Sequence, residues 1–329
     1  MNAMMIRGFP YAISSWAAAL LLAGCGASQS QPPIATDVVR ATQPNATPTD
    51  SSELLFVSDA GTNDVYILTL PALKLKKTIG GFDQPYHLCS DNDGNVWVPN
   101  LGGRQVLEYN HQGKRINSVS YSSYGYPDAC AAGPGGLLAV FGGPSYGNKN
   151  LELYFALEVP IKLTIAGFSS YDYGTYDSKG NLFVDGTDTA SKFVLGVVPP
   201  NKTKGHLIDL TGGTIHSPGF VQWYAQGDNL VVADENCKNG NTCIYTVKIA
   251  GSKGTITGAV DLLSPSGRGN CGVFQAAIDP TTGKDIAGNI QGCHTYASVD
   301  RWAYPAGGTP TNSLQNFVKV PIGAAISAK

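Results

Sequence analysis

The sequence contains two strings that look like catalytic or metal sites, and each lacks a part that its chemistry needs. Residues 143–147 match the G-x-S-x-G string of serine hydrolases, but that elbow needs a following helix and residues 151–155 are strand-like. Residues 91–95 begin like a calcium loop, yet Gly102 stands where a Glu ligand belongs. The five His form no pair at ligand spacing. We therefore predict no catalytic residue, no metal ligand and no cofactor, with a divalent cation left open.

Seven other residues could form a binding site, because they fall near the starts of short predicted strands. If those strands line one channel, their side chains meet at one mouth and offer imidazole, carboxylate, amide and aromatic groups to a ligand. The alternative is that each side chain caps a strand end and faces water. The seven residues are His87, Asp128, Asp172, Tyr173, Gln222, Trp223 and Gln275.

A repeated unit positions these residues. Its clearest copy is residues 84–109, in which a short segment, a Gly-Asn turn, an apolar strand and an aromatic-bearing strand follow one another. Matched strand centres recur at intervals of 41 to 55 residues, and several short strands in each interval are typical of four-stranded propeller blades. An irregular β-sandwich is the alternative. The matched centres are Phe56, Trp97, Leu138, Phe183, Val231 and Ile286.

The two ends of the repeats complement one another. The first copy, at residues 54–57, has no first strand before it, and residues 320–327 look like a first strand without a partner. We expect the C-terminal strand to complete the N-terminal blade, which leaves no exposed edge. The prediction is an all-β domain at residues 53–329, a six-bladed β-propeller closed by its C-terminal strand.

The copies resemble the NHL, YncE and SMP-30 group of bacterial six-bladed propellers, most closely at residues 85–100. This resemblance implies architecture more than activity, because the fold hosts enzymes, receptors and scaffolds. Gluconolactonases of the SMP-30 type hold a divalent ion through Glu, Asn and Asp. Here Asp128 is one candidate ligand, but its Glu and Asn companions are not identifiable and the Glu-Gly-Pro opening strand is missing.

The chain begins with an export signal. One charge, Arg7, precedes an apolar stretch at residues 11–24 that is too short to span a membrane. Residues 22–25, Leu-Ala-Gly-Cys, resemble the lipobox of bacterial lipoproteins, which implies cleavage after residue 24 and lipid on Cys25. An ordinary secreted protein is the alternative. Residues 25–52 then read as the lipidated Cys and a flexible tether, and Gly26 favours the outer membrane or cell surface.

Six further Cys form an even set in an exported domain, which favours disulfides. Cys237 and Cys243 flank a turn-rich loop, and Cys271 and Cys293 fall in one predicted blade. Cys89 and Cys130 stand at equivalent positions of adjacent blades, where the alternative is two buried thiols.

Composition narrows the possible functions. The 22 Lys and Arg against 24 Asp and Glu give no basic footprint for nucleic acid, and 43% hydrophobic residues allow a large core. We predict a monomeric, extracytoplasmic, membrane-tethered propeller that binds a protein, peptide or glycan without catalysis. The alternative is a metal-dependent lactonase or esterase of the SMP-30 type.

Overall fold

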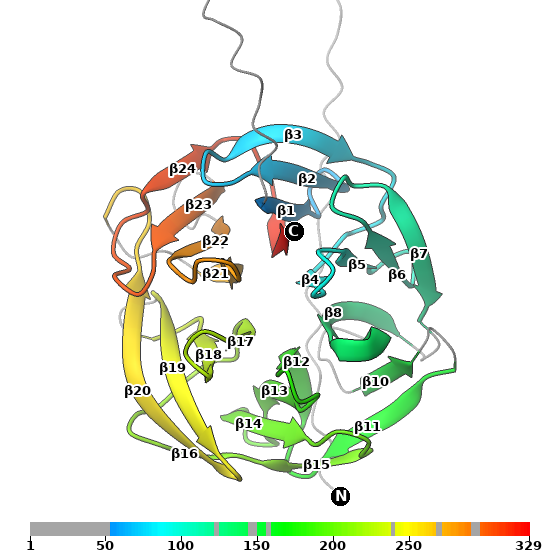
Figure 1. The fold of residues 1–329 in the computed structure, drawn as a ribbon, viewed down its shortest axis with the longest axis vertical. Coiled ribbons are helices and arrows are strands. Elements are labelled where there is room, and N and C mark those ends of the chain that lie inside the picture. The colour runs from blue at the N-terminus through cyan, green and yellow to red at the C-terminus, as the bar shows by residue number, and fades with distance from the viewer. Residues whose placement is uncertain are drawn as a thin grey trace, which may run out of the picture. The chain divides into compact units, whose positions relative to one another are not determined.

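The described part of the chain folds into mainly antiparallel β-sheets around a common centre (Figure 1). The computed structural model describes residues 53–121, 125–143, 150–155, 159–237, 241–267, 272–290 and 297–329. All of these belong to the second of two units, residues 48–329. Cys25, Cys271 and Cys293, with their predicted lipid and disulfide, lie outside the described residues, as do residues 144–147 of the serine-hydrolase string. The described residues contain no helix long and apolar enough to span a membrane.

Three sheets have four strands each in the order of the chain, except that the last strand of the protein joins the first sheet. The first sheet is β25 (Pro321–Ala328), β1 (Glu53–Asp59), β2 (Asp64–Thr69) and β3 (Lys74–Ile79). The second is β4 (Cys89–Ser90), β5 (Val96–Asn100), β6 (Gln105–Tyr109) and β7 (Arg115–Ser120). The third is β21 (Val273–Ile278), β22 (Asp285–Ile290), β23 (Ser298–Ala303) and β24 (Asn312–Gln315).

Two larger sheets complete the ring. The eight-stranded sheet contains β8 (Tyr126–Ala132), β9 (Leu137–Gly143), β10 (Asn150–Phe155), β11 (Ile161–Ile165), β15 (Lys204–Leu207), β14 (Phe193–Val198), β13 (Leu182–Thr187) and β12 (Ser170–Tyr176). The five-stranded sheet contains β16 (Asp209–Thr211), β20 (Lys253–Leu262), β19 (Thr242–Ala250), β18 (Asn229–Asp234) and β17 (Val221–Tyr224). A short 3-10 helix, η1 (Pro134–Gly136), joins β8 to β9.

The strands differ in composition according to their distance from the centre. We call each run of consecutive strands from the centre to the perimeter a strand group. The second strand of each group, such as β5 or β18, is buried along almost its whole length, since neighbouring sheets pack against both of its faces. The six matched centres predicted from the repeat all lie on such strands and are at most 6% exposed. The perimeter strands β3 and β7 (Figure 1) are largely exposed and polar. The core is therefore a set of apolar layers between neighbouring sheets.

One turn recurs at the inner ends of the sheets. Asp91 Oδ1 accepts hydrogen bonds from the backbone N–H groups of Asp93 and Asn95, while its Oδ2 accepts one from the Asn95 amide. Asp177 makes the same three bonds with Lys179 and Asn181. The central glycine is at φ 76° in the first turn and 84° in the second, a conformation that favours glycine. The string that resembles a calcium loop is thus used as a turn.

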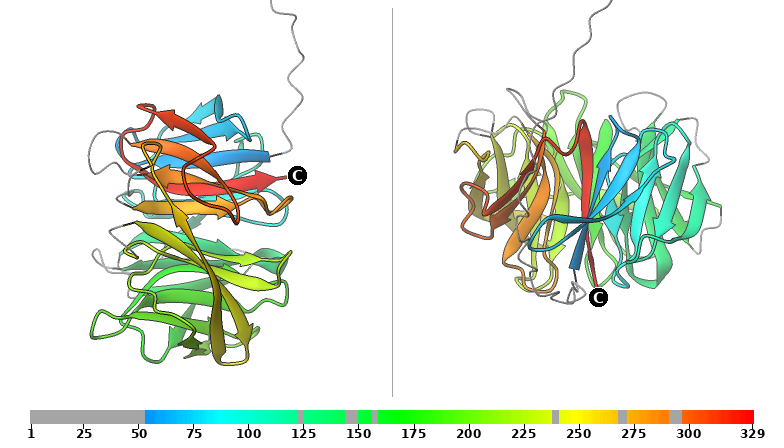
Figure 2. Two further views of the ribbon diagram at one scale, coloured as in Figure 1. Left: turned by 90° about the vertical axis from the view of Figure 1, so that its left-hand side faces the viewer. Right: turned by 90° about the horizontal axis from the view of Figure 1, so that it is seen from above.

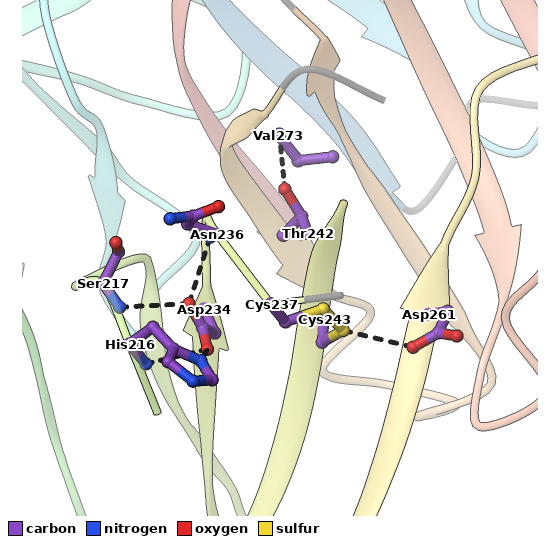
Figure 3. The surroundings of a disulfide bond; sticks show 9 residues. All are labelled: His216, Ser217, Asp234, Asn236, Cys237, Thr242, Cys243, Asp261 and Val273. Carbon is purple, nitrogen blue, oxygen red and sulfur yellow. Dashed lines mark hydrogen bonds and ion pairs between the residues drawn. A yellow bond between two sulfur atoms is a disulfide. The ribbon is translucent and has the colours of Figure 1, made fainter. Parts of the chain in front are cut away.

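Two of the predicted disulfides are confirmed. Cys89 on β4 and Cys130 on β8 are bonded with Cα atoms 5.6 Å apart, so two consecutive inner strands are joined covalently. Cys237 and Cys243, with Cα atoms 5.8 Å apart, join the loop after β18 to β19 (Figure 3). Such bonds are typical of proteins that fold in an oxidising, extracytoplasmic environment.

Candidate functional site

Three inner strands contain local irregularities at predicted site residues. The pairing of β8 with β9 shifts between Pro127 and Ala129, which leaves Asp128 as an extra residue. Equivalent shifts occur in β12 between residues 171 and 174 and in β21 between residues 273 and 276. Bulges of this kind re-aim side chains and are common beside functional sites. They account for the placement of four predicted site residues, Asp128, Asp172, Tyr173 and Gln275.

Tyr173 is the centre of a buried polar cluster at one end of the channel. Its hydroxyl lies 3.0 Å from His87 Nε2, 3.2 Å from Glu235 Oε1 and 3.0 Å from the carbonyl oxygen of Phe274. The His87 backbone N–H donates to the carbonyl of Asp128 at 3.1 Å. Tyr173 therefore reaches from β12 to residues of three other strand groups. We name His87, Asp128, Asp172, Tyr173 and Glu235 the Tyr173 cluster.

Proton positions in this cluster follow from burial. Burial lowers the pKa of His87 to about 3, so the imidazole is neutral. Burial is the main reason that the pKa of Glu235 is raised to about 8; the Tyr173 hydrogen bond lowers it, and the charges of Asp172 and Asp234 add to the rise. At neutral pH the Tyr173 hydroxyl donates to the Phe274 carbonyl, which can only accept. The hydroxyl also donates toward Glu235 Oε1, so the two acceptors share its one proton, and it accepts a hydrogen bond from the Nε2–H of the neutral His87.

Further carboxyl groups surround the cluster. Asp185 is fully buried, and burial followed by the charge of Asp172 raises its pKa well above the usual value. Its two oxygens accept the backbone N–H groups of Tyr173 and Gly219, at 2.9 and 3.1 Å. Burial also raises the pKa of Asp172, whose Oδ2 accepts the Ser170 hydroxyl. This end of the channel therefore carries acidic and aromatic groups.

The loop that carries Glu235 is fixed on both sides (Figure 3). Before it, the buried Asp234 accepts the backbone N–H groups of His216, Ser217 and Asn236 at 2.8 to 3.0 Å. After it comes the disulfide of Cys237 and Cys243. These contacts hold Glu235 against Tyr173. Sequence reasoning missed Glu235, because it follows a second strand rather than a first one.

Two predicted ligand-binding amides are already bonded to backbone. Gln275 Oε1 accepts the N–H groups of Leu88 and Ala324 at 2.8 and 2.9 Å, and its Nε2 donates to the Leu88 carbonyl at 2.7 Å. Gln222 bonds the N–H and the carbonyl of Ile278 in the same way, at 2.7 and 2.9 Å. Each amide occupies the inner edge of another strand group as a neighbouring peptide would. We assign both residues a positioning role.

A cavity of about 330 Å³ extends from Tyr173 to the turns that follow the inner strands. Trp223 lines it and stacks on Phe183 with ring centroids 5.5 Å apart. Among the described lining residues none is Lys, Arg or His, and the remaining groups are mostly small, apolar, hydroxyl or aromatic. They include Ser90, Thr175, Tyr176, Ser178, Tyr224, Ala277 and Ala328.

The structure thus divides the seven predicted site residues. His87, Asp128, Asp172 and Tyr173 come together in the Tyr173 cluster. Gln222, Trp223 and Gln275 line the cavity with Tyr173, and His87 is not among its lining residues. Ala328 lines the cavity and pairs with Glu53. The cavity therefore lies toward the face on which the described chain begins and ends; Figure 2 shows this end of the chain. We call this face the entry face.

Solved structures place this arrangement among known folds. A chain of the nidogen/laminin complex superposes with a TM-score of 0.63 at 12% identity, over 84% of this chain and 98% of that chain. A Bacteroides caccae protein of unknown function superposes with a TM-score of 0.61 at 12% identity, over 84% of this chain and 99% of that chain. The β-propeller domain of Myceliophteria thermophila Swd1 superposes with a TM-score of 0.54 at 13% identity, over 82% of this chain and 85% of that chain.

The described residues form a β-propeller. At these identities the likeness establishes the fold and no activity. No protein-family model matches the sequence, and no curated protein matches it. Function has to be argued from the propeller's own residues.

One group of described side chains has its ligand atoms close enough for a metal ion. Cys237, Cys243 and Asp261 offer atoms within 4.8 Å of one another (Figure 3). The two sulfurs form a disulfide, whereas a metal is bound by thiolate. This group is therefore a disulfide with a neighbouring carboxylate.

Replacing Glu235 with Gln is expected to flatten the pH dependence of propeller stability. The folded protein keeps the Glu235 proton up to pH about 8, whereas the unfolded chain loses it near pH 4.5. The free energy of unfolding therefore falls as pH rises between these values, by roughly 2–4 kcal/mol after allowance for partial exposure. The Gln amide does not titrate, and its carbonyl oxygen can accept the Tyr173 hydroxyl at every pH. Urea unfolding at pH 5 and pH 8 measures the difference, and Asp209→Asn on the exposed β16 should retain the wild-type slope. Equal slopes for Glu235→Gln and wild type would refute the assignment.

Proposed function

We propose that the chain is a membrane-tethered, extracytoplasmic propeller that binds a protein, peptide or glycan without catalysis. The observation that carries this proposal is the cavity above Tyr173. Its volume of about 330 Å³ suits a small group such as one sugar ring or one side chain. Aromatic faces and hydroxyl groups line it, and both kinds of group recognise sugars and peptides. Asp91 and Asp177 line the cavity and none of its described lining residues is Lys, Arg or His, which disfavours an anion.

We infer six blades in this propeller. The eight-stranded sheet counts as two blades, because only two residue pairs join β11 to β15 and they are parallel, unlike the antiparallel pairs within each half. β16 is then an outer connection from the fourth blade to β20 of the fifth. Pairing of β25 with β1 from residues 53–59 supports closure by the C-terminal strand.

The tethered location draws on sequence and topology together. The lipobox-like residues 22–25 favour lipid on Cys25, and residues 26–52 favour a flexible link. The pairing of Glu53 with Ala328 supports attachment of that link on the entry face. Mass spectrometry of the mature N-terminus tests acylation of Cys25, and an unmodified thiol there would contradict the anchor.

The lactonase alternative has one observation in its favour. Burial raises the pKa of Tyr173, and so do four nearby carboxyl groups, which therefore lie around one point: those of Glu235, Asp185, Asp172 and Asp128. Both oxygens of Asp185 are bonded to backbone. Calorimetry with calcium, zinc and manganese distinguishes a metal-dependent lactonase from a binding module. Tight binding that Asp128→Ala abolishes, together with lactone hydrolysis, would favour the enzyme over the binding module.

Occluding the cavity tests the binding proposal. Ser178 is exposed, lines the cavity and follows the turn-forming Asp177. Ser178→Trp should reduce binding to any hit on glycan and peptide arrays by at least tenfold. Thr189→Trp is the matched control, because Thr189 follows Asp188 in a turn with the same two backbone hydrogen bonds at the opposite end of β13. Equal binding by both variants would place the ligand elsewhere.

A further inference from the structure

Five cations gather on the outer edge of two adjacent sheets. Lys74, Lys76 and Lys77 lie on β3, Arg115 begins β7 and Lys114 directly precedes it, and all five are exposed. Neither strand carries Asp or Glu. We call these five residues the basic edge. The whole chain has a formal net charge of −2, so the basic edge is a local concentration of positive charge.

The two parts of the basic edge are held side by side. Lys77 Nζ donates to the carbonyl oxygens of Gly113 and Gln112 at 2.6 and 3.2 Å. A Cβ on Gly113 would lie 2.4 Å from Ile67 and 3.2 Å from Ile79, so the turn before β7 packs closely on the first sheet. Both strands lie on the perimeter of the ring (Figure 1). The basic edge therefore lies on the outer rim of two neighbouring sheets.

Protection of an open sheet edge explains only part of this composition. Lysine on an edge strand discourages pairing with another chain. However, Leu75 and Ile116 on the same strands are 50% and 48% exposed, which does not serve that purpose. The perimeter strands β11 and β20 differ, because each pairs with a neighbour, β15 or β16. β3 and β7 end their sheets.

We propose that the basic edge docks the propeller on a bilayer that contains anionic phospholipid. Cations approach the phosphate surface, and Leu75 and Ile116 enter the interface between them. The strand register supports this placement. Lys74 pairs with Thr69, and Thr69 pairs with Leu54, so Lys74 lies at the same end of the first sheet as Glu53, where the described chain begins. The ring then stands on its edge, with both ends of the channel accessible. This inference rests on the proposed membrane tether.

Vesicle binding without the lipid tests the docking surface separately from the anchor. The probe is vesicles of phosphatidylcholine with or without phosphatidylglycerol, co-sedimented with the full chain carrying Cys25→Ser. We expect binding that needs phosphatidylglycerol and weakens at high salt. The combined variant Lys74→Glu, Lys76→Glu, Lys114→Glu should bind about a hundredfold more weakly, at roughly fivefold for each cation. It leaves Lys77 and its bonds between the sheets intact.

A matched variant on the opposite side of the ring provides the control. Lys202→Glu, Lys204→Glu, Lys253→Glu changes the charge equally on the outer strands β15 and β20 and just before β15, and should bind vesicles within twofold of wild type. Equal loss in both triple variants would overturn the docking surface, as would equal binding to neutral vesicles. Leu75→Ser with Ile116→Ser, which keeps every charge, should weaken binding about tenfold and covers the case in which the Glu variant does not fold. Neither result depends on acylation of Cys25 or on a ligand in the cavity.

Discussion

A chain that ends at Val320 is expected to lose cooperative unfolding. Removing residues 321–329 deletes β25, which pairs with β1 at six positions between Glu53 and Asp59. The deletion exposes an edge of β1, which is fully buried from Leu54 to Asp59. It also removes the buried Ile322, and it takes Ala324, Ala325 and Ile326 from two core clusters; each of these four residues is at most 6% exposed. Lost burial and unpaired backbone groups act together, so the cost should exceed the 5–15 kcal/mol that stabilises a typical domain.

Urea unfolding followed by circular dichroism measures this effect. Wild type should give a single steep transition, and the truncated chain a shallow signal that changes without a midpoint. Deletion of Lys329 alone is the control, because that residue is exposed and outside β25. Ile326→Ala is the graded version, with an expected loss of about 2–4 kcal/mol. A truncated chain with the wild-type midpoint would show that the β25–β1 pairing contributes little to stability.

The repeat and the disulfides were the parts of the molecule most open to prediction. Apolar strand centres such as Phe56, Val231 and Ile286 stand out because a strand with sheets on both faces must be apolar along its length. Cys89 and Cys130 could be paired because they precede equivalent turns. The strand centres and this disulfide were both inferred from a repeat along the chain, and such a repeat can be read from the sequence without knowledge of contacts across the ring.

The site could be predicted only in part, because its chemistry depends on contacts across the ring. His87 and Tyr173 are far apart in the chain, and a bulge in β12, which no periodicity reveals, turns Tyr173 inward. Glu235, which also contacts Tyr173, lies in the loop after a second strand, whereas the predicted site residues lie near the starts of first strands. Whether an amide such as Gln222 is free for a ligand depends on whether a backbone edge lies opposite, and here Ile278 does. Spacing alone cannot distinguish a ligand-binding amide from one that bonds the backbone.

Gln275→Met is expected to destabilise the propeller by about 3–5 kcal/mol. Met fills a similar volume, but it leaves three buried backbone groups without partners: the N–H and carbonyl of Leu88 and the N–H of Ala324. Each unsatisfied group costs about 1–3 kcal/mol. Leu88 is 1% exposed, so water does not replace the lost bonds without rearrangement. Urea midpoints at one pH measure the change, and Gln226→Met is the matched control. The Gln226 amide also donates to backbone carbonyls, those of Pro280 and Thr281, but it is exposed and should cost less than 1 kcal/mol.

Gln275→Glu separates hydrogen bonding from packing at the same position. A protonated Glu donates to the Leu88 carbonyl and accepts from both N–H groups, as Gln does, whereas an ionised Glu faces that carbonyl with a negative charge. Burial favours the protonated form, so the pKa of this Glu is raised in the folded state. The free energy of unfolding should therefore fall as pH rises above the pKa of the unfolded chain, and the variant should approach wild type near pH 4. A Gln275→Glu protein that is as stable as wild type at pH 8 would mean that this amide does not bridge the inner strands in solution.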